Sequence, residues 1–310
     1  MTLRDMNSNM RVLDRDKLVM TLRKLLVSAL DRPGGRSALA KIACLYAKRL
    51  AGAHSRPVRV FYDRLSSSWG REYDGEHVVD GAKFEYYGGH LMARNGAAPW
   101  RELARKYWLQ HFEVRSGDVV LDVGAEVGTD TVLFDAVVGS GGVVLAIEAH
   151  PVTFLRLKRT LQLSHCHRTV PILAAISAVA GPVFIEDGPD SLSSTISMGL
   201  EGQERHMVPG VTLDALCEEH GIKDVALLKM NIEGAEAPAL QGMSKCLQNT
   251  RNVVIACHDF RADAGEGELY RTRDKVCAKL TSLGFELLPN SFNPAVDHIS
   301  ARDHVFARRR

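Results

Sequence analysis

The most informative segment of the chain is Asp118-Val-Val-Leu-Asp-Val-Gly-Ala-Glu-Val-Gly-Thr-Asp-Thr131. Its apolar run Val119–Val123, with one acid inside it, predicts a buried strand. Two glycines follow, Gly124 and Gly128, and residues 129–138 then predict a helix. Open α/β sheets hold nucleotide-type cofactors at such a strand, glycine turn and helix. Glycine lets a ligand approach the backbone, and the helix start offers free N–H groups.

A second strand strengthens this interpretation. The continuous apolar run Val143–Ile147 ends at Glu148, twenty residues beyond Gly128. A carboxylate at this place can accept both ribose hydroxyls of an adenosine. The alternative is that Glu148 only precedes a helix that begins at Pro151. The spacing Asp-x-Gly-x-x-x-Gly is not the dinucleotide motif and occurs by chance, so the order of strand, turn, strand and acid carries the cofactor prediction.

Strands and helices alternate from residue 117 onward, which predicts a mostly parallel sheet with helices on both faces. The last two strands have no helix between them, and a short loop cannot make a parallel crossover, so we expect an antiparallel last strand. The expected strands are 119–123, 143–147, 170–176, 182–186, 226–230, 253–257, 285–288 and 304–308. The expected helices are 129–138, 151–161, 214–221, 235–247 and 268–283.

The residues before this core suggest an extension of helices and short strands. We divide the chain into a basic helical extension over 1–56, a small β element with a helix over 57–115, and a cofactor-binding domain over 116–310. The middle segment is where an element that covers a substrate would come from. Within the first 115 residues, the expected helices are 16–30, 38–51 and 98–112, and the expected strands are 57–64 and 76–87, with a hairpin at Asp80-Gly81.

Composition places the chain among ordinary globular proteins, with 45% hydrophobic and 25% charged residues in a length of 310. No apolar run approaches the roughly eighteen residues that a membrane span needs. We expect no secretory signal, because the first residues carry no apolar segment. Six scattered cysteines without a Cys-x-x-Cys pair fit the reducing cytoplasm.

Charge is unevenly distributed. Residues 1–59 carry thirteen Lys or Arg against four Asp, a charge of +9, which leaves −7 for the rest of a chain whose net charge is +2. This asymmetry is compatible with peripheral contact between residues 1–56 and an anionic membrane. We favour a helical cap on the main domain, because the apolar faces lack the Trp and Phe usual at membrane interfaces. An organellar transit peptide is a further alternative, disfavoured by Asp5, Asp14 and Asp16. No basic motif interleaved with aromatics indicates nucleic acid, and the oligomeric state stays open.

Three motifs follow one another along the chain. They are Asp122-Val-Gly-Ala-Glu-Val-Gly128, Ala146-Ile-Glu-Ala-His-Pro151 and Lys229-Met-Asn-Ile-Glu-Gly-Ala-Glu236. Together they resemble class I S-adenosylmethionine-dependent methyltransferases, and within these the FkbM family, whose signature is Lys-Ile-Asp-Val-Glu-Gly-Ala-Glu. Thr212-Leu-Asp214 and Ser193-Ser194 also match features of this family. The resemblance covers roughly 117–308 and implies a Rossmann-like sheet that binds S-adenosylmethionine.

The resemblance also implies which residues meet the cofactor and the acceptor. We expect cofactor contacts at strand ends and turns, at Asp122, Gly124, Ala125, Glu126, Gly128, Thr131, Glu148, Ala149, Ala175 and Asn231. Ligands gather at the carboxyl ends of parallel strands, so we expect the catalytic residues among Asn231, Glu233, His258 and Asp259. A hydroxyl is a poor nucleophile while it keeps its proton. We therefore predict His258 as general base, oriented by Asp259 or Glu233, with a histidine bonded to backbone as the alternative.

The sequence departs from the family pattern at three positions. Asn231 stands where the family usually has Asp, Glu126 where Asn is usual, and Ala256 where Glu is common. Some relatives of the fold bind Mg²⁺, and Asn231, Glu233 and Asp259 are oxygen ligands of the kind that this ion takes. Replacement of an acid by Asn231 removes one charge, so we predict no metal.

The predicted function is O-methylation of a hydroxyl on a sugar, glycolipid or polyketide-type natural product. Members of the family are associated with these substrates, in secondary metabolism or glycolipid biosynthesis. One alternative is a catalytically weakened scaffold that binds S-adenosylmethionine. Another is a nicotinamide-dependent reductase, since Glu148 would suit that ribose too. The glycine spacing, the absence of a Tyr-x-x-x-Lys pair and the antiparallel last strand argue against the reductase.

Overall fold

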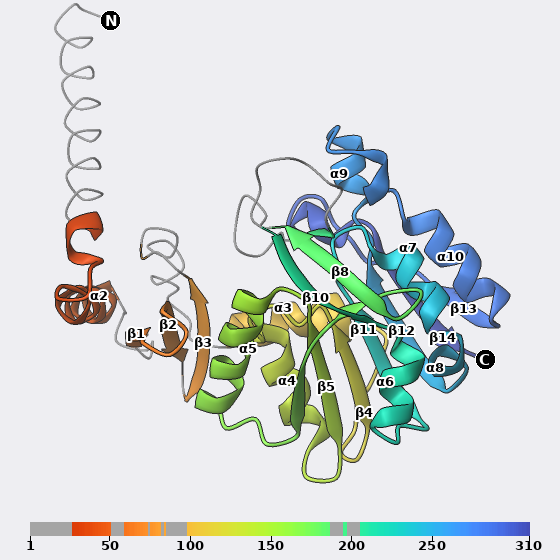
Figure 1. Ribbon diagram of the computed structural model, residues 1–310, viewed down its shortest axis with the longest axis horizontal. Helices are drawn as coiled ribbons and strands as arrows, with labels where there is room; N and C mark the ends of the chain where they lie inside the picture. The colour runs from red at the N-terminus through yellow and green to blue at the C-terminus, as the bar shows by residue number, and fades with distance from the viewer. Residues whose placement is uncertain are drawn as a thin grey trace, which may run out of the picture. The chain divides into compact units, whose positions relative to one another are not determined.

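The computed structural model (Figure 1) describes residues 27–50, 59–73, 75–81, 84, 98–186, 195–196 and 205–310. The chain divides into two compact units, Met1–Gly96 and Ala97–Arg310. Most of the predicted helix 16–30 and the motif Ser193-Ser194 lie outside the described residues. The predicted boundary after residue 56 lies outside them too. The predicted boundary after residue 115 differs from the observed one, because helix α3 (Ala98–Trp108) packs with the second unit through Ala104 and Trp108.

The second unit is built on the predicted Rossmann-like sheet, which has seven strands in the order β13-β14-β12-β11-β4-β5-β6 (Figure 1). The strands from β12 to β6 are parallel, and β14 lies antiparallel between β12 and β13, so the predicted antiparallel last strand is confirmed. The bounds are β4 Val119–Val123, β5 Val143–Glu148, β6 Thr169–Leu173, β11 Val225–Met230, β12 Thr250–Ala256, β13 Phe285–Leu288 and β14 His304–Arg309.

Helices cover both faces of this sheet, since alternate residues of each strand point to opposite sides. Leu121 and Val123 of β4 pack on the side of α6, α8 and α10, while Val120 packs on the side of α3 and α4. All six residues of β11 are buried, as expected for a central strand covered on both faces. The helix bounds are α4 Thr129–Val138, α5 Pro151–Leu163, α6 Leu213–Glu219, α8 Ser244–Gln248 and α10 Arg273–Ser282.

A second, smaller sheet in this unit has the order β7-β10-β8-β9. The single strand predicted over 170–176 is therefore wrong, because β6 ends at Leu173 and β7 joins the smaller sheet. Strand β10 was not predicted, since Pro209 and Gly210 interrupt its pattern. It pairs antiparallel with β8 and parallel with β7. The bounds are β7 Ala175–Ile176, β8 Gly181–Glu186, β9 Thr195–Ile196 and β10 Arg205–Val211.

Two predicted helices are shorter than expected. In place of 235–247 the chain forms α7 (Glu236–Ala239), a 3₁₀ turn (Leu240–Gly242) and α8. The break falls at Gly242, where a Cβ would lie 2.2 Å from the Ser177 carbonyl oxygen. In place of 268–283, a 3₁₀ turn (Glu268–Tyr270) precedes α10. Helix α9 (Asp259–Asp263), which was not predicted, precedes the 3₁₀ turn and α10 in the chain.

The first unit, described by itself, holds helix α2 (Arg36–Leu50) and a three-stranded antiparallel sheet. Asp31 organises it, because its carboxylate accepts from Trp69 Nε1 at 2.9 Å and from the Phe84 N–H at 3.0 Å. Its strands are β1 Arg59–Asp63, β2 Ser68–Tyr73 and β3 Glu76–Gly81. The middle strand, β2, was not predicted. Across the described ranges of both units, no helix has the length and apolar character to cross a bilayer.

Candidate active site

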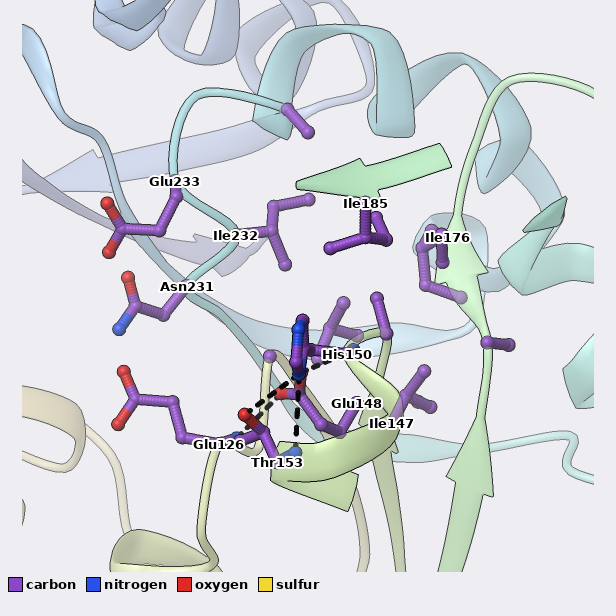
Figure 2. Close-up of a pocket in the computed structure, with 16 residues that line it drawn as sticks. Glu126, Ile147, Glu148, His150, Thr153, Ile176, Ile185, Asn231, Ile232 and Glu233 are labelled. Atoms are coloured by element: carbon purple, nitrogen blue, oxygen red, sulfur yellow. Dashed lines mark hydrogen bonds between the residues drawn. The ribbon is translucent and has the colours of Figure 1, made fainter. Parts of the chain in front are cut away.

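A pocket opens at the carboxyl ends of the parallel strands (Figure 2). The empty space within it, including open solvent at its mouth, is about 660 Å³. Its walls come from the turn after β4, the end of β5, the start of α5, strands β7 and β8, and the loop after β11. The lining residues are Val123, Gly124, Glu126, Ile147, Glu148, Ala149, His150, Thr153, Ala174, Ala175, Ile176, Ile185, Asn231, Ile232, Glu233 and Ala235.

The turn after β4 needs glycine at its first position. Gly124 has φ +76°, and its N–H donates to the Ile147 carbonyl at 2.9 Å. A Cβ on Gly124 would lie 1.8 Å from the carbonyl oxygen of Asn231. The turn therefore fits tightly against the loop after β11, and any side chain at Gly124 would push the two walls of the pocket apart.

Asp122 stabilises this turn through hydrogen bonds on the side away from the pocket. Thr131 Oγ1 donates to Asp122 Oδ2 at 2.6 Å, and Lys229 Nζ donates to Asp122 Oδ1 at 2.8 Å and to the Gly124 carbonyl at 2.7 Å. Burial would lower the pKa of Lys229, but Asp122 and Asp130 outweigh burial and raise it. The Asp122 side chain is fully buried and neither it nor Thr131 lines the pocket. Asp122 and Thr131, which we predicted as cofactor contacts, therefore stabilise the turn through hydrogen bonds behind the pocket wall.

Glu148 closes the β5 side of the pocket. Its Oε2 accepts the Glu126 N–H at 2.9 Å, and its Oε1 accepts the His150 N–H at 2.8 Å. Burial raises the pKa of Glu148, which these two N–H groups offset only in part. Each carboxylate oxygen can accept more than one hydrogen bond. Glu148 can therefore hold the backbone and still accept from a ligand hydroxyl.

His150 lines the pocket, although no role was predicted for it. It precedes α5, and its side chain accepts from the Thr153 N–H at 3.4 Å, next to Pro151 at the helix start. Its ring packs edge to face against the ring of His206 in β10, with 4.8 Å between the ring centroids. The motif that ends in His150-Pro151 signals this helix cap, whereas the contact with His206 depends on the strand that was not predicted.

Behind the opposite wall, His258 is buried between two carboxylates. Its Nδ1 lies 3.0 Å from Glu236 Oε1, and its Nε2 lies 3.1 Å from Glu233 Oε1. The Glu236 side chain is fully buried, and its Oε2 accepts from Thr272 Oγ1 at 3.1 Å. Arg261 Nη1 donates to Glu233 Oε2 at 2.5 Å. Every polar atom of the His258 ring is thus engaged.

This arrangement keeps a proton on His258. Burial alone would lower the pKa of His258, but the bonds to Glu233 and Glu236 raise it to about 10. An imidazolium held at both nitrogens has no lone pair with which to take a proton from a hydroxyl. The prediction that His258 is the general base is therefore at odds with the geometry. Burial would also raise the pKa of Glu233, but His258 and Arg261 together hold it below its ordinary value.

Asp259, one of the two carboxylates considered as partners of His258, bonds to other groups. Its Oδ2 accepts the N–H groups of Thr272 and Arg273, each at 3.0 Å. These N–H groups lie at the start of α10 and have no partner within the helix, which is why a carboxylate is held there. Glu233, the other predicted partner, does contact His258.

Two polar side chains of the pocket have no bonding partner among the described residues. The Oδ1 atom of Asn231 is buried and accepts no hydrogen bond there, and no hydrogen bond or ion pair within those ranges ends on the carboxylate of the half-buried Glu126. We call Glu126 and Asn231 the open edge. Figure 2 shows them in one column with Glu233, beside the group around Glu148 and His150. A buried polar atom without a partner, such as Asn231 Oδ1, is uncommon and fits a site that receives a ligand.

The pocket thus combines a satisfied acid at one end with open acceptors at the other, which fits a nucleoside cofactor beside a polar group. The predicted site residues that line it are Gly124, Glu126, Glu148, Ala149, Ala175, Asn231 and Glu233; those that do not are Asp122, Ala125, Gly128, Thr131, His258 and Asp259. In the described part of the chain no group of three or more His, Cys, Asp or Glu is placed to hold a metal ion.

Comparison with known proteins identifies the family. Residues 122–287, more than half of the chain, match the family model described as the methyltransferase FkbM domain. The chain therefore belongs to the FkbM methyltransferase family. The match begins at Asp122, ahead of the glycine turn, and includes the Glu148 and Asn231 walls of the pocket.

One curated relative is the hexuronic acid methyltransferase AglP of Haloferax volcanii. It is 26% identical over 146 residues, which cover 47% of this chain and 58% of that protein. The chain thus matches less than two thirds of this relative. Among solved structures, the FkbM methyltransferase of Methylobacillus flagellatus is 15% identical with a TM-score of 0.44, over 71% of this chain and 51% of that one. Aeropyrum pernix fibrillarin, solved with S-adenosyl-L-methionine, is 14% identical with a TM-score of 0.39, over 83% and 95%.

Proposed function

We propose that this methyltransferase uses S-adenosylmethionine to methylate a hydroxyl group of a sugar or sugar-containing molecule. The observation that carries the proposal is the pocket itself, which Glu148, the Gly124 turn and the open edge line together at the strand ends. The family membership supplies the reaction type. The relative named as a hexuronic acid methyltransferase supports a sugar as the acceptor.

Residues of this chain fit the cofactor in three ways. Glu148 offers carboxylate oxygens to ribose hydroxyls, as acids at this strand end do in related sheets. Apolar side chains of Ile147 and Ile176 flank it and suit an adenine ring. The unpartnered Asn231 Oδ1 suits a donor such as an ammonium group. Bound there, S-adenosylmethionine supplies an electrophilic methyl carbon, and the chain positions an acceptor oxygen against it.

The test is calorimetric titration of the purified full-length chain with S-adenosylmethionine, S-adenosylhomocysteine and NADPH. We expect the first two to bind, and Glu148→Gln to weaken both by about 10- to 100-fold, since a hydrogen bond to a charged group contributes about 1.5–3 kcal/mol. Glu219→Gln, on the exposed side of α6, is the matched control and keeps the affinity of the wild type.

Each other outcome selects an alternative. Binding of NADPH alone would replace the proposal by a reductase. Binding of S-adenosylmethionine without methyl transfer to any sugar would favour a cofactor-binding scaffold. Equal affinities in the Glu148→Gln protein and the wild type would show that the ribose lies elsewhere. Contact of residues 1–56 with membranes and a cytoplasmic location remain predictions from the sequence.

A further inference from the structure

Glu126 is held in an unusual backbone conformation at the mouth of the cofactor turn. It has φ +50°, a region that residues with a Cβ rarely adopt. Its N–H donates to Glu148 Oε2 at 2.9 Å, which fixes the backbone. Strained residues of this kind cluster at functional sites, where surrounding contacts impose the conformation. The carboxylate of Glu126 lies on the same side as the side chains of Asn231 and Glu233 (Figure 2).

Glu126 differs from Glu233, the other carboxylate on this side of the pocket. Glu233 also has a positive φ, +53°, but its oxygens are engaged by His258 and Arg261. Within the described ranges the Glu126 carboxylate has no such partner, so its lone pairs remain available to a ligand. His258 is held between two carboxylates that keep its proton, and Glu233 is ion-paired. Of these three groups, Glu126 is the one whose carboxylate has no bonding partner in the described part of the chain.

We propose that Glu126 is the catalytic proton acceptor, and that it takes the proton of the acceptor hydroxyl during methyl transfer. The inference rests on the proposed function, because it assigns a role within that reaction. It concerns a residue of this chain that departs from the family pattern, in which Asn is usual at this position.

The chemical step is balanced with Glu126 as a carboxylate. The hydroxyl oxygen forms a bond to the methyl carbon while the carbon–sulfur bond breaks, and that electron pair stays on sulfur as a neutral thioether. The hydroxyl proton moves to Glu126, which becomes a neutral carboxylic acid. One positive and one negative charge are thereby consumed together. A carboxylate beside a sulfonium is suited to this step because the two opposite charges cancel and the reacting groups end neutral.

Burial and the charges around Glu126 bring the pKa of its carboxyl group close to neutral pH. Burial is the strongest influence and raises the pKa, Lys229 lowers it, and Asp130, Glu148 and Glu233 raise it, so that the pKa reaches about 8. A base is most effective when its pKa lies near the working pH. A bound sulfonium favours the carboxylate form and brings the pKa back toward neutrality.

The experiment compares the full-length wild type with Glu126→Gln and the control Glu219→Gln. Methyl transfer from S-adenosylmethionine to glucuronic acid, glucose and methyl glucoside is followed as S-adenosylhomocysteine formation between pH 6 and 10. We expect the wild-type rate to rise with pH to a plateau. Glu126→Gln should lose at least about 100-fold in kcat and lose this rise. Its affinity for S-adenosylmethionine should fall by less than about tenfold.

A second readout does not depend on turnover. In infrared titration of the protein with S-adenosylhomocysteine, a carboxylic acid band should disappear as pH rises toward 9. We expect this band in the wild type and the control and its absence in Glu126→Gln. If the band persists in Glu126→Gln, or the variant keeps more than a tenth of kcat, the proton-acceptor role is overturned.

The two proposals fail in different ways. A wild type that binds S-adenosylmethionine but methylates none of the three sugars overturns the proposed acceptor class. An active wild type with an equally active Glu126→Gln overturns only the role of Glu126. Loss of S-adenosylmethionine binding in Glu126→Gln, with the thermal midpoint kept, would make Glu126 a cofactor ligand and overturn the proton-acceptor role.

Discussion

Two regions around one pocket differ in how their polar groups are satisfied. In the supporting region, Asp122 is bonded by Lys229 and Thr131, and His258 by two glutamates. At the open edge, neither the buried Asn231 Oδ1 nor the carboxylate of the half-buried Glu126 has a bonding partner in the described chain. A buried polar group costs free energy unless it is bonded. The contrast separates groups whose partners are in the protein from groups left open to a ligand.

The supporting region should show the largest loss when one partner is removed. Lys229→Met leaves the Asp122 carboxylate buried and without its cation, which costs about 3–5 kcal/mol. We expect the urea midpoint to fall accordingly. Lys158→Met, at an exposed position of α5, is the matched control and should change the free energy of unfolding by less than about 0.5 kcal/mol.

A double variant sharpens the same test. Lys229→Met with Asp122→Asn removes both charges, so it should recover part of the stability that Lys229→Met loses. If Lys229→Met costs less than about 1 kcal/mol, the pair is solvated and does not support the turn.

His258→Gln should have the next largest effect, about 2–3 kcal/mol near neutral pH, because it removes a charged hydrogen-bonding group between two carboxylates. The sign follows from linkage. The folded pKa of about 10 lies above the ordinary value of 6.5. The stability due to His258 is therefore fully present below about pH 6.5 and is lost as pH rises through 10.

The measurement is thermal or urea unfolding of wild type and His258→Gln from pH 6 to 10.5. The difference between the two proteins should shrink over this range. A constant difference would mean that His258 is neutral in the folded protein, and the general-base prediction for His258 would then be open again.

The smallest effect is expected at the open edge. Asn231→Asp adds a carboxylate near Glu126 and restores the acid usual in the family. A like charge raises a carboxyl pKa, so the pH at which Glu126 titrates should move upward, by about one unit or less. Infrared titration of the single variant measures this shift. An unchanged titration would show that the two side chains do not interact, and the open edge would then be two separate groups.

The pattern located pocket-lining residues best where a residue's position depends on its own strand and turn. The Gly124 turn and Glu148 were both found from an apolar run followed by punctuation, and both line the pocket. Asp122 was found by the same pattern but does not line the pocket, because its carboxylate bonds to Lys229. Lys229 lies more than a hundred residues further along the chain, so the local pattern could not show this bond. Local pattern fixes that a strand ends there and does not fix which way its acid points.

The misassigned residues share a cause. His258 looked like a base because histidine titrates near neutral pH, but the two carboxylates that bond it come from the loop after a neighbouring strand. Strand β10 was missed because Pro209 and Gly210 break its pattern, although pairing with β8 stabilises it. Proton affinity and strand pairing both depend on partners distant in sequence.

The alternating strands and helices, the antiparallel last strand, the glycine turn and the family could all be predicted from the sequence, because each follows from short-range periodicity or contiguous motifs. Which polar groups bond one another, and which remain open to a ligand, became visible in the folded chain. Burial and the charges brought near by folding set these properties, and no single segment contains them. The position of Glu126 beside Asn231, on turns after different strands, is the clearest case.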